Sequence, residues 1–357
     1  MNVIFSIFDF GWNGTTIPTT HILTIPTMTT RTISYRTQIE DKRKRVYLRK
    51  CAPDREIRVE DLFIGATLVV YSRQLTLTGY ADENTAIAMA NRRESGTIIV
   101  KPSDVCRVGR VLAAVQEEGM QVVDFRTVDF GARAKEELTT ALPRDSAELL
   151  AGTSCAIQVM GKDANAVLER MFSDVDLVRS MDAEHARALA ELASTQPSST
   201  KSSARSSLVV VKPSGMEHLG KIVDVIVEKK GFTLVQAKTM VLTRAEAESF
   251  YAVYVDVLDK EEVKLMVDEL SSGGCVALHL SAPEDRSASI VDELRDVVGP
   301  RDPEVAKALR PESLRALFGV DKQRNAAHCT DLADDGSLEV EFFFHLPRKH
   351  APIEVAA

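Results

Sequence analysis

Cysteine is sparse in this chain and follows no pattern. The five cysteines among 357 residues stand singly, at Cys51, Cys106, Cys155, Cys275 and Cys329. A zinc site or a disulfide framework would need paired cysteines, or cysteine and histidine at ligand spacing, and no such spacing occurs. We therefore expect neither feature, and we expect a protein of a reducing compartment such as the cytoplasm.

Long apolar runs are also missing. No stretch approaches the roughly 20 apolar residues that span a bilayer, so we expect no membrane partner. The first 26 residues contain no lysine or arginine, and their apolar run, Val3–Phe8, is shorter than the core of a signal peptide. We expect residues 1–30 to form an unstructured leader, and Met28 is a candidate start.

A net positive charge is absent. The chain has 44 Lys and Arg residues against 52 Asp and Glu residues, a formal net charge of −8. General binding to nucleic acid requires a cationic surface, so we expect no nucleic acid partner. The cationic run Lys42–Arg45 fits a solvated strand or loop, with a binding patch as the alternative.

The common phosphate-binding motifs of nucleotide enzymes are missing as well. There is no Walker loop of the form GxxxxGK[ST], and the protein-kinase set of a His-Arg-Asp motif followed by an Asp-Phe-Gly motif is absent, because no His-Arg-Asp occurs. These absences exclude the P-loop and protein-kinase mechanisms. Phosphoryl transfer by this chain would need another arrangement, such as a covalent phospho-enzyme.

An internal repeat is present. Thr97–Ser103 resembles Leu208–Ser214, and each is an apolar run that ends in Lys-Pro-Ser. In both copies a glycine, an amphipathic helical stretch and a second glycine follow, at Gly109 and Gly119 in the first copy and at Gly220 and Gly231 in the second. A later β-rich run recurs as Ser154–Val159 and Gly274–His279. Two copies of one α/β unit are the simplest explanation.

These patterns predict an α+β architecture in which helices pack on a mostly antiparallel sheet. The first run of each repeat is continuously apolar, as in a strand that is buried on both faces. Ahead of the repeats, Thr67–Tyr71 and Gln74–Thr78 have hairpin spacing. We divide the chain into a leader (1–30), a small β-rich leading domain (31–92), a first repeat (93–193), a polar linker (194–206), a second repeat (207–348) and a tail (349–357).

Four further elements follow from local patterns. Ile222–Lys230 and Arg244–Tyr251 are rich in helix formers or have helical periodicity, and Gly231 supplies a stop for the first of them. Met181–Arg187 predicts an amphipathic surface helix. The aromatic run Val340–Phe344 predicts a core strand.

The stretch Arg324–Thr330 concentrates the groups that phosphoryl transfer needs. It contains an arginine, an amide and His328, and Arg315 lies nine residues before it. Cationic groups position phosphates, and an unprotonated imidazole nitrogen is a competent nucleophile. We interpret His328 as the phosphoryl acceptor, with a structural histidine as the alternative. Lys212, which follows a buried strand, is interpreted as a phosphate ligand rather than an ordinary strand-end lysine.

With these residues in place, residues 207–348 resemble a nucleoside diphosphate kinase domain. The resemblance is carried by the segment from Leu309 to Leu332, and in the leading domain by Glu60–Gly65 and Tyr71–Leu75. It covers about residues 34–348, and the tandem layout is similar to an axonemal branch of the family. The resemblance implies two tandem ferredoxin-like (βαββαβ) kinase domains preceded by a small β-rich domain.

The resemblance also implies roles for single residues. His328 would be the phosphorylated nucleophile, with Thr330 and Glu339 orienting its ring. The ligands of the phosphates and the ribose would be Lys212, Arg295, Arg315 and Asn325, and Tyr254 would be the tyrosine near the histidine. Arg295 could instead pair with Asp292 on its own helix. The implied cofactor is Mg²⁺, held through the phosphates of ATP or another nucleoside triphosphate.

Several positions depart from the family pattern. Glu262 (or its neighbour Val263) and Lys322 stand where the family pinches the base between an aromatic and an aliphatic side chain. Arg301 replaces a threonine that contacts phosphate. The first repeat keeps Lys101 but has no counterpart of the Arg-Asn-His segment, so we expect this repeat to serve packing or binding without catalysis.

Two functions therefore remain open. The first is transfer of the terminal phosphoryl from a nucleoside triphosphate to a nucleoside diphosphate through phospho-His328, in a ciliary or flagellar axoneme. The alternative is a catalytically weak structural component of axonemal microtubules. The expected partners are nucleotides and tubulin or other axonemal proteins, and the expected location is the cytoplasm and cytoskeleton.

Overall fold

The computed structural model describes residues 94–345, apart from 132–137, 140–141, 143, 173–174, 197–205 and 283–288. Before residue 94 it describes the backbone of eight strands. The cationic run at 42–45, most of the expected linker and the expected tail lie outside the described residues. The ends of the expected linker differ from the structure, because helix α6 continues to Thr195 and strand β13 begins at Ser206.

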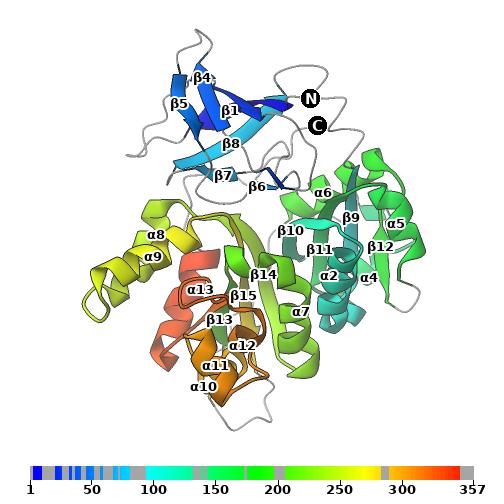
Figure 1. The fold of residues 1–357 in the computed structure, drawn as a ribbon. Helices are drawn as coiled ribbons and strands as arrows, with labels where there is room; N and C mark the ends of the chain where they lie inside the picture. The colour runs from blue at the N-terminus through cyan, green and yellow to red at the C-terminus, as the bar shows by residue number, and fades with distance from the viewer. Residues whose placement is uncertain are drawn as a thin grey trace.

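The leading part of the chain forms a six-stranded antiparallel sheet with the order β5-β4-β2-β1-β8-β7 (Figure 1). Its strands are β1 (Val3–Asp9), β2 (His21–Ile25), β4 (Thr37–Asp41), β5 (Val46–Cys51), β7 (Thr67–Val70) and β8 (Arg73–Tyr80), and a separate pair is formed by β3 (Thr32–Ile33) and β6 (Ile57–Arg58). The predicted hairpin is confirmed, because β7 and β8 pair from Val70 and Arg73 outward. The prediction of an unstructured leader is wrong at β1 and β2. The short apolar run, too short for a signal peptide, is instead a sheet strand between β2 and β8.

The two repeats follow the same order of elements. The first contains β9 (Glu94–Val100), the 3-10 helix η2 (Pro102–Arg107), α2 (Val108–Glu117), β10 (Gln121–Val128), α4 (Ser146–Leu149), β11 (Ser154–Gly161), α5 (Ala164–Arg170), β12 (Leu177–Arg179) and α6 (Ala183–Thr195). The second begins with β13 (Ser206–Val211), η4 (Pro213–His218), α7 (Leu219–Asp224) with its π-helical continuation η5 (Val225–Lys229), β14 (Thr233–Val241), α8 (Arg244–Phe250), η6 (Tyr251–Tyr254) and α9 (Lys260–Leu270). It ends with β15 (Gly274–Ser281), α10 (Ile290–Val298), α11 (Pro303–Leu309), α12 (Leu314–Phe318), β16 (Ala327–Cys329), η7 (Ala333–Asp335) and α13 (Gly336–Phe344).

One eight-stranded antiparallel sheet runs through both repeats, with the order β12-β9-β11-β10-β14-β15-β13-β16. Within each repeat the first strand lies between the third and the fourth, and the second strand lies beyond the third. This is the βαββαβ ferredoxin-like arrangement, so the predicted fold class is confirmed. Its consequence for the site is that the last strand of each repeat pairs with the first.

The first strand of each repeat is buried on both faces, as its apolar run predicted. Val209 and Val211 of β13 pack in a core with α7 and α10, while Leu208 and Val210 pack with α8, α9 and α13. Ile99 of β9 likewise faces a different core from its neighbours on either side. Helices therefore cover both faces of the sheet.

The two repeats join edge to edge where β10 meets β14. Arg126 pairs with Lys238 in the ladder. On either side of this pair a threonine satisfies the partner strand: Phe125 donates its N–H to Thr239 Oγ1 at 2.8 Å, and Ala237 donates its N–H to Thr127 Oγ1 at 3.0 Å. These side-chain bonds extend a short ladder and tie the repeats together.

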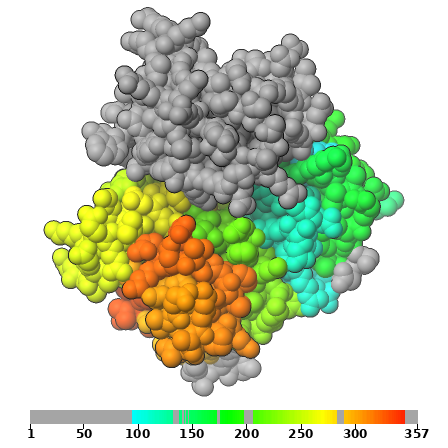
Figure 2. Space-filling view, in the orientation of Figure 1, coloured from blue at the N-terminus to red at the C-terminus, as the bar shows by residue number. Residues whose placement is uncertain are grey.

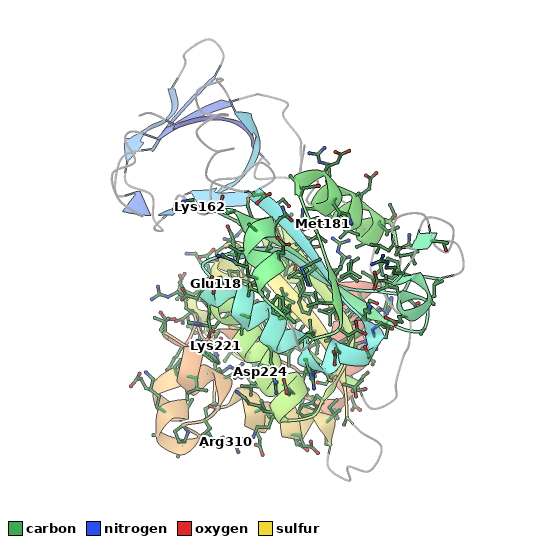
Figure 3. The ribbon with its side chains drawn as sticks, turned by 90° about the vertical axis from the view of Figure 1, so that its right-hand side faces the viewer. Glu118, Lys162, Met181, Lys221, Asp224 and Arg310 are labelled. Carbon is green, nitrogen blue, oxygen red and sulfur yellow. The ribbon has the colours of Figure 1, made fainter. Side chains whose placement is uncertain are left out.

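Helices α2 and α7 cross on one face of the joined sheet, and Figure 3 shows them side by side with Lys221 and Asp224 of α7 labelled. Glycines allow the close approach. A Cβ on Gly109 would lie 2.2 Å from the Asp224 nitrogen, and one on Gly220 would lie 2.0 Å from the Ala113 nitrogen. Real Cβ contacts are never that short, so both glycines are required where the helices touch.

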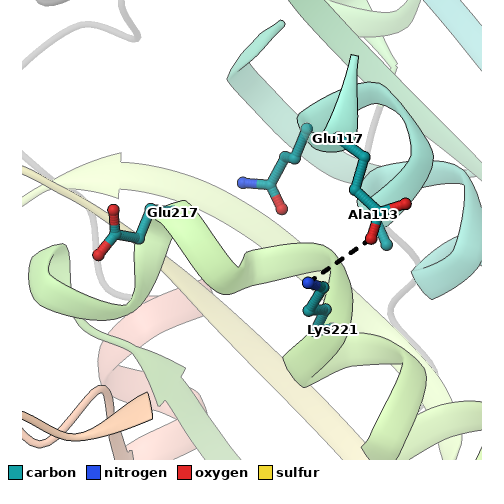
Figure 4. A pocket seen from close by; sticks show the side chains of 5 residues that line it. Ala113, Glu117, Glu217 and Lys221 are labelled. Atoms are coloured by element: carbon teal, nitrogen blue, oxygen red, sulfur yellow. Dashed lines mark ion pairs between the residues drawn. The ribbon is translucent and has the colours of Figure 1, made fainter. Parts of the chain in front are cut away.

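A small hollow opens beside this crossing (Figure 4). Across it, Lys221 forms an ion pair with Glu117 at 3.5 Å. The Gln116 side chain donates to the Met216 carbonyl at 2.7 Å and accepts from the Gly220 N–H at 2.8 Å. The crossing is thus fixed by polar contacts as well as by packing.

The helices expected within the repeats are present as α7 with η5, α8 and α6. The predicted strand Val340–Phe344 is wrong, because these residues end helix α13. Val340 and Phe343, three residues apart, are the buried ones, and this is helical rather than alternating spacing. Packing on β13 and against the Phe250 ring overrides the β propensity of the aromatic run. No helix of the described residues is long and apolar enough to cross a bilayer.

We predict that Gly220→Ala lowers the free energy of unfolding by about 1–3 kcal/mol, because the added methyl forces α2 and α7 apart. Gly109→Ala should act similarly from the other helix. Gly131→Ala is the matched control, since a Cβ there meets nothing within 4 Å. Urea unfolding of the three variants measures the effect, and equal stability of Gly220→Ala and Gly131→Ala would contradict the glycine crossing.

Candidate active site

His328 lies in the middle of β16, at the edge of the sheet. Its backbone position is set by pairing with Val210 of β13, and its side chain is buried. Ala326, which directly precedes β16, has a φ of +66°, a left-handed conformation that is uncommon for a residue with a side chain. The Ala326 carbonyl accepts from the Lys212 N–H at 2.9 Å, so this unusual turn is tied directly to the end of β13.

Glu339 holds the ring of His328. Its Oε1 lies 3.1 Å from His328 Nε2, and its Oε2 accepts from the Thr330 hydroxyl at 2.7 Å. That hydroxyl in turn accepts from the Leu208 N–H at 3.1 Å. A carboxylate can only accept when ionised, so the proton of the neutral ring sits on Nε2 and the lone pair sits on Nδ1. Glu339 does this from the first turn of α13, not from a strand.

Aromatic rings fix the remaining freedom of the imidazole. The Phe250 ring lies edge-on to His328, with centroids 5.0 Å apart, and the Tyr251 ring lies 6.3 Å away. Tyr251 is fully buried, and burial raises the pKa of its phenol. The sequence argument selected Tyr254 and missed both of these residues. No local pattern could have found them, because their contacts with His328 join residues 78 and 77 positions apart.

Lys212 directly follows β13 and is buried. Its ammonium donates to the Asn325 side-chain carbonyl at 2.9 Å and to the Gln323 carbonyl. Burial, assisted by the charges of Arg315 and Arg301 and opposed by those of carboxylates, lowers the pKa of Lys212 to about 7. The lysine therefore lies among other cations at a buried position, where an arriving anion would favour its charged form.

Asn325 and Arg315 are held by the same backbone turns. The Asn325 amide donates to the Arg301 carbonyl at 3.0 Å. Arg315 donates from Nε to the Ala327 carbonyl at 3.0 Å and from Nη1 to the Gly299 carbonyl at 2.9 Å. The structure thus brings together His328, Thr330, Glu339, Lys212, Asn325 and Arg315 as the sequence predicted.

Arg295 and Tyr254 lie around a different residue, Asp331. Tyr254 donates its hydroxyl to the Asp331 carboxylate. Arg295 donates to the Asp331 carbonyl and lies 3.7 Å from its carboxylate, with about half of its side chain exposed. Its ion-pair partner in the described part of the chain is therefore Asp331 and not Asp292. The predicted roles of Arg295 and Tyr254 as ligands of the nucleotide stay predictions.

Charged side chains occupy the positions where the nucleobase of the nucleotide was expected to bind. Val263 is buried in the core, so Glu262 is the residue of that pair that faces outward. Glu262 pairs with Arg301 at 2.8 Å, and Lys322 lies 3.7 Å from the Asp302 carboxylate. The side of the site away from His328 is thus bridged by ion pairs.

The first repeat lacks the chemistry at the equivalent place. Val178 of β12 pairs with Ile99 of β9, which is the register position that His328 holds opposite Val210. Lys101 contacts the carboxylates of Asp145, Glu148 and Asp176, at 2.8, 2.5 and 2.8 Å. Burial works against its charge, but the three carboxylates outweigh burial and raise the pKa of Lys101. A valine has no nucleophilic atom, and the positive charge of Lys101 is already compensated by three carboxylates.

The site contains cations, an amide and an oriented imidazole, which are the groups for holding a polyphosphate beside a nitrogen nucleophile. Among the described residues no group of three or more acidic, histidine or cysteine side chains is placed to hold a metal ion. The structure places Thr330 and Glu339 in hydrogen-bond contact with each other and Glu339 in contact with the His328 ring, and the roles of the three residues in catalysis stay predictions.

Comparison with known proteins gives the same family. A family model described as nucleoside diphosphate kinase matches residues 205–348. Nucleoside diphosphate kinase homolog 7 of Rattus norvegicus is 30% identical over 344 residues, which cover 85% of this chain and 84% of that protein. The homolog of Mus musculus matches to the same extent.

Shorter relatives match about two-fifths of the chain. The nucleoside diphosphate kinase of Aquifex aeolicus is 34% identical over 139 residues, 38% of this chain and 92% of that protein. A crystal structure of the Aquifex aeolicus kinase covers 39% of this chain and 94% of its own, at 33% identity and a TM-score of 0.36. From the match along most of its length to nucleoside diphosphate kinase homolog 7, the chain belongs to the nucleoside diphosphate kinase family.

Proposed function

We propose that the second repeat transfers the terminal phosphoryl of a nucleoside triphosphate, such as ATP, to a nucleoside diphosphate through phospho-His328. The observation that carries the proposal is the hydrogen bond between Glu339 and His328 Nε2, at 3.1 Å. It leaves Nδ1 as the nitrogen with the lone pair, in a neighbourhood that contains Lys212 and Arg315. Family membership supports a kinase-type enzyme.

The reaction has two steps of the same kind. Nδ1 attacks the terminal phosphorus, the bond from that phosphorus to the bridging oxygen breaks, and the nucleoside diphosphate leaves with the electron pair. A second nucleoside diphosphate then attacks the phosphorus with a terminal phosphate oxygen, and the phosphorus–nitrogen bond breaks. Lys212 and Arg315 stabilise charge on the moving group. Glu339 compensates the positive charge that the ring acquires.

Mg²⁺ belongs to the proposal as a ligand of the nucleotide. Bound to the phosphates, it would neutralise part of their charge and keep them in one geometry. The cationic and amide side chains of this site suit phosphate oxygens rather than a metal ion, so the chain itself would contact the phosphates.

A second candidate function is a structural role in the axoneme of cilia or flagella. Two observations support it. The first repeat has Val178 at the position of the nucleophile, and ion pairs occupy the positions of the second repeat where the nucleobase was expected to bind. In this proposal the chain resides in the cytoskeleton and contacts tubulin or other axonemal proteins. Detergent extraction of flagella tests it, because a chain found wholly in the soluble fraction would exclude stable attachment.

We predict that the full-length protein, mixed with Mg²⁺ and ATP labelled in the terminal phosphate, acquires acid-labile label on His328. His328→Ala should lose the label. His345→Ala, which changes an exposed histidine at the end of α13, should keep it. Label that persists in His328→Ala, or none in the wild type, would reject the phospho-enzyme.

We also predict that Glu339→Gln slows labelling by about 10- to 100-fold, the rate equivalent of losing a hydrogen bond to a charged group. The amide can donate to Nε2 and so favours the wrong tautomer. Glu341→Gln changes an exposed carboxylate two residues further along α13 and is the matched control. Equal labelling rates in the two variants would show that Glu339 does not orient the ring.

A third prediction concerns the uptake of a proton by Lys212 when a nucleotide binds. At pH 8 a lysine with a pKa of about 7 is mostly neutral, and phosphate binding favours its charged form. ADP binding at pH 8 should therefore take up close to one proton. Calorimetry in two buffers of different ionisation enthalpy measures this. Lys212→Met should lose the uptake and Lys229→Met, at an exposed lysine, should retain it; identical heats in both buffers for the wild type would contradict the assignment.

A further inference from the structure

The Glu262–Arg301 ion pair joins helix α9 to the loop that precedes α11. The two groups lie 2.8 Å apart, and their side chains are about one-third exposed, at 29% and 32%. A second pair, Lys322 with Asp302, spans 3.7 Å beside it. Because both pairs are partly solvated, an arriving anion can compete with their carboxylates.

Arg301 is connected to the residues that hold phosphate. Its carbonyl accepts from the Asn325 amide at 3.0 Å, and the other end of that amide accepts from Lys212 at 2.9 Å. Its charge also acts on the Lys212 ammonium. Arg301 is therefore a third cation beside Lys212 and Arg315.

The three cations differ in what they bind. Lys212 donates to an amide and a carbonyl, and Arg315 donates to two carbonyls. The guanidinium of Arg301 instead contacts a carboxylate, Glu262, and the sulfur of Met266 at 3.4 Å. Glu262 thus occupies Arg301 with a group whose charge and geometry are similar to those of a phosphate oxygen pair.

Glu262, Arg301 and Lys322 stand where a nucleobase would need an aromatic or apolar side chain to stack on. A nucleobase binds well when it stacks on an aromatic or apolar side chain. In the described part of the site the aromatic side chains Phe250 and Tyr251 are buried against His328. Facing the opposite side are Glu262, Arg301 and Lys322, and covering these charges with a base would remove them from water at a cost.

We propose that this site recognises the polyphosphate tail of its ligand and gains little from the base. In the ligand complex Arg301 leaves Glu262 and binds phosphate oxygens, so that the Glu262–Arg301 pair sets both affinity and the lack of base selection. This inference rests on the proposed phosphotransfer function for the identity of the site. The ligand class is a linear polyphosphate with three phosphates, with or without a nucleoside attached.

Calorimetry on the full-length protein tests the first part, with inorganic tripolyphosphate and ATP as probes, each with Mg²⁺. The dissociation constants of the two should agree within tenfold. Binding of ATP more than tenfold tighter than tripolyphosphate would show that the nucleoside is recognised, and would overturn the proposal.

Three variants test the role of Arg301. Arg301→Gln should weaken both ligands by at least tenfold, while Glu262→Gln should tighten both by at least threefold, since the guanidinium is then available. A merely structural ion pair would predict weaker or unchanged binding for Glu262→Gln, and either result overturns the proposal. Glu304→Gln, which removes an exposed carboxylate from a nearby ion pair on α11, is the matched control and should change neither constant.

These binding measurements need no turnover, so the two proposals fail separately. Should Glu262→Gln tighten tripolyphosphate while His328 acquires no label, the anion site stands and phosphotransfer fails. Should His328 acquire label while Glu262→Gln leaves both constants unchanged, phosphotransfer stands and the role of Arg301 fails.

Discussion

The hydrogen-bond chain from the Leu208 N–H through Thr330 and Glu339 to His328 is the interaction on which the site depends. It begins on the backbone of β13, so the imidazole is oriented by a strand that is paired on both sides. The pairing of β13 with β16 fixes the same ring from its backbone. Because Glu339 accepts the hydrogen bond of Nε2, the reactive lone pair lies on Nδ1. Lys212 and Arg315 then only need to hold a phosphate near Nδ1.

The two repeats show how one fold can keep or lose this chemistry. Thr127 and Thr239, at equivalent positions of the two repeats, join strands β10 and β14. Gly109 and Gly220 allow α2 and α7 to cross. These features preserve the packing of both copies. The nucleophile position, in contrast, holds His328 in one copy and Val178 in the other. Val178 packs into a core of the first repeat, so this copy has the shape of the fold without a reactive group at that position.

Local sequence patterns were enough to predict the first strand of each repeat, because Thr97–Ser103 and Leu208–Ser214 contain apolar runs buried on both faces. The segment around Asn325 and His328 was also identified, since its groups are contiguous. Failures came where distant packing decides. The aromatic run of α13 becomes a helix because it packs on β13 and Phe250, and Tyr251 lies near His328 through a turn whose geometry no local pattern specifies. The strand β1 was missed because one of its two partners, β8, lies far along the chain. The Glu262–Arg301 contact likewise joins residues 39 positions apart.

Phosphorus NMR of the full-length protein after reaction with ATP and Mg²⁺ is the most direct measurement of the central claim, because it distinguishes phosphate on the two imidazole nitrogens. Since Glu339 engages Nε2, the resonance of phosphate on Nδ1 of His328 is expected, and it should disappear when a nucleoside diphosphate is added. Phosphate on Nε2, or on another residue, would contradict the assigned orientation of the ring.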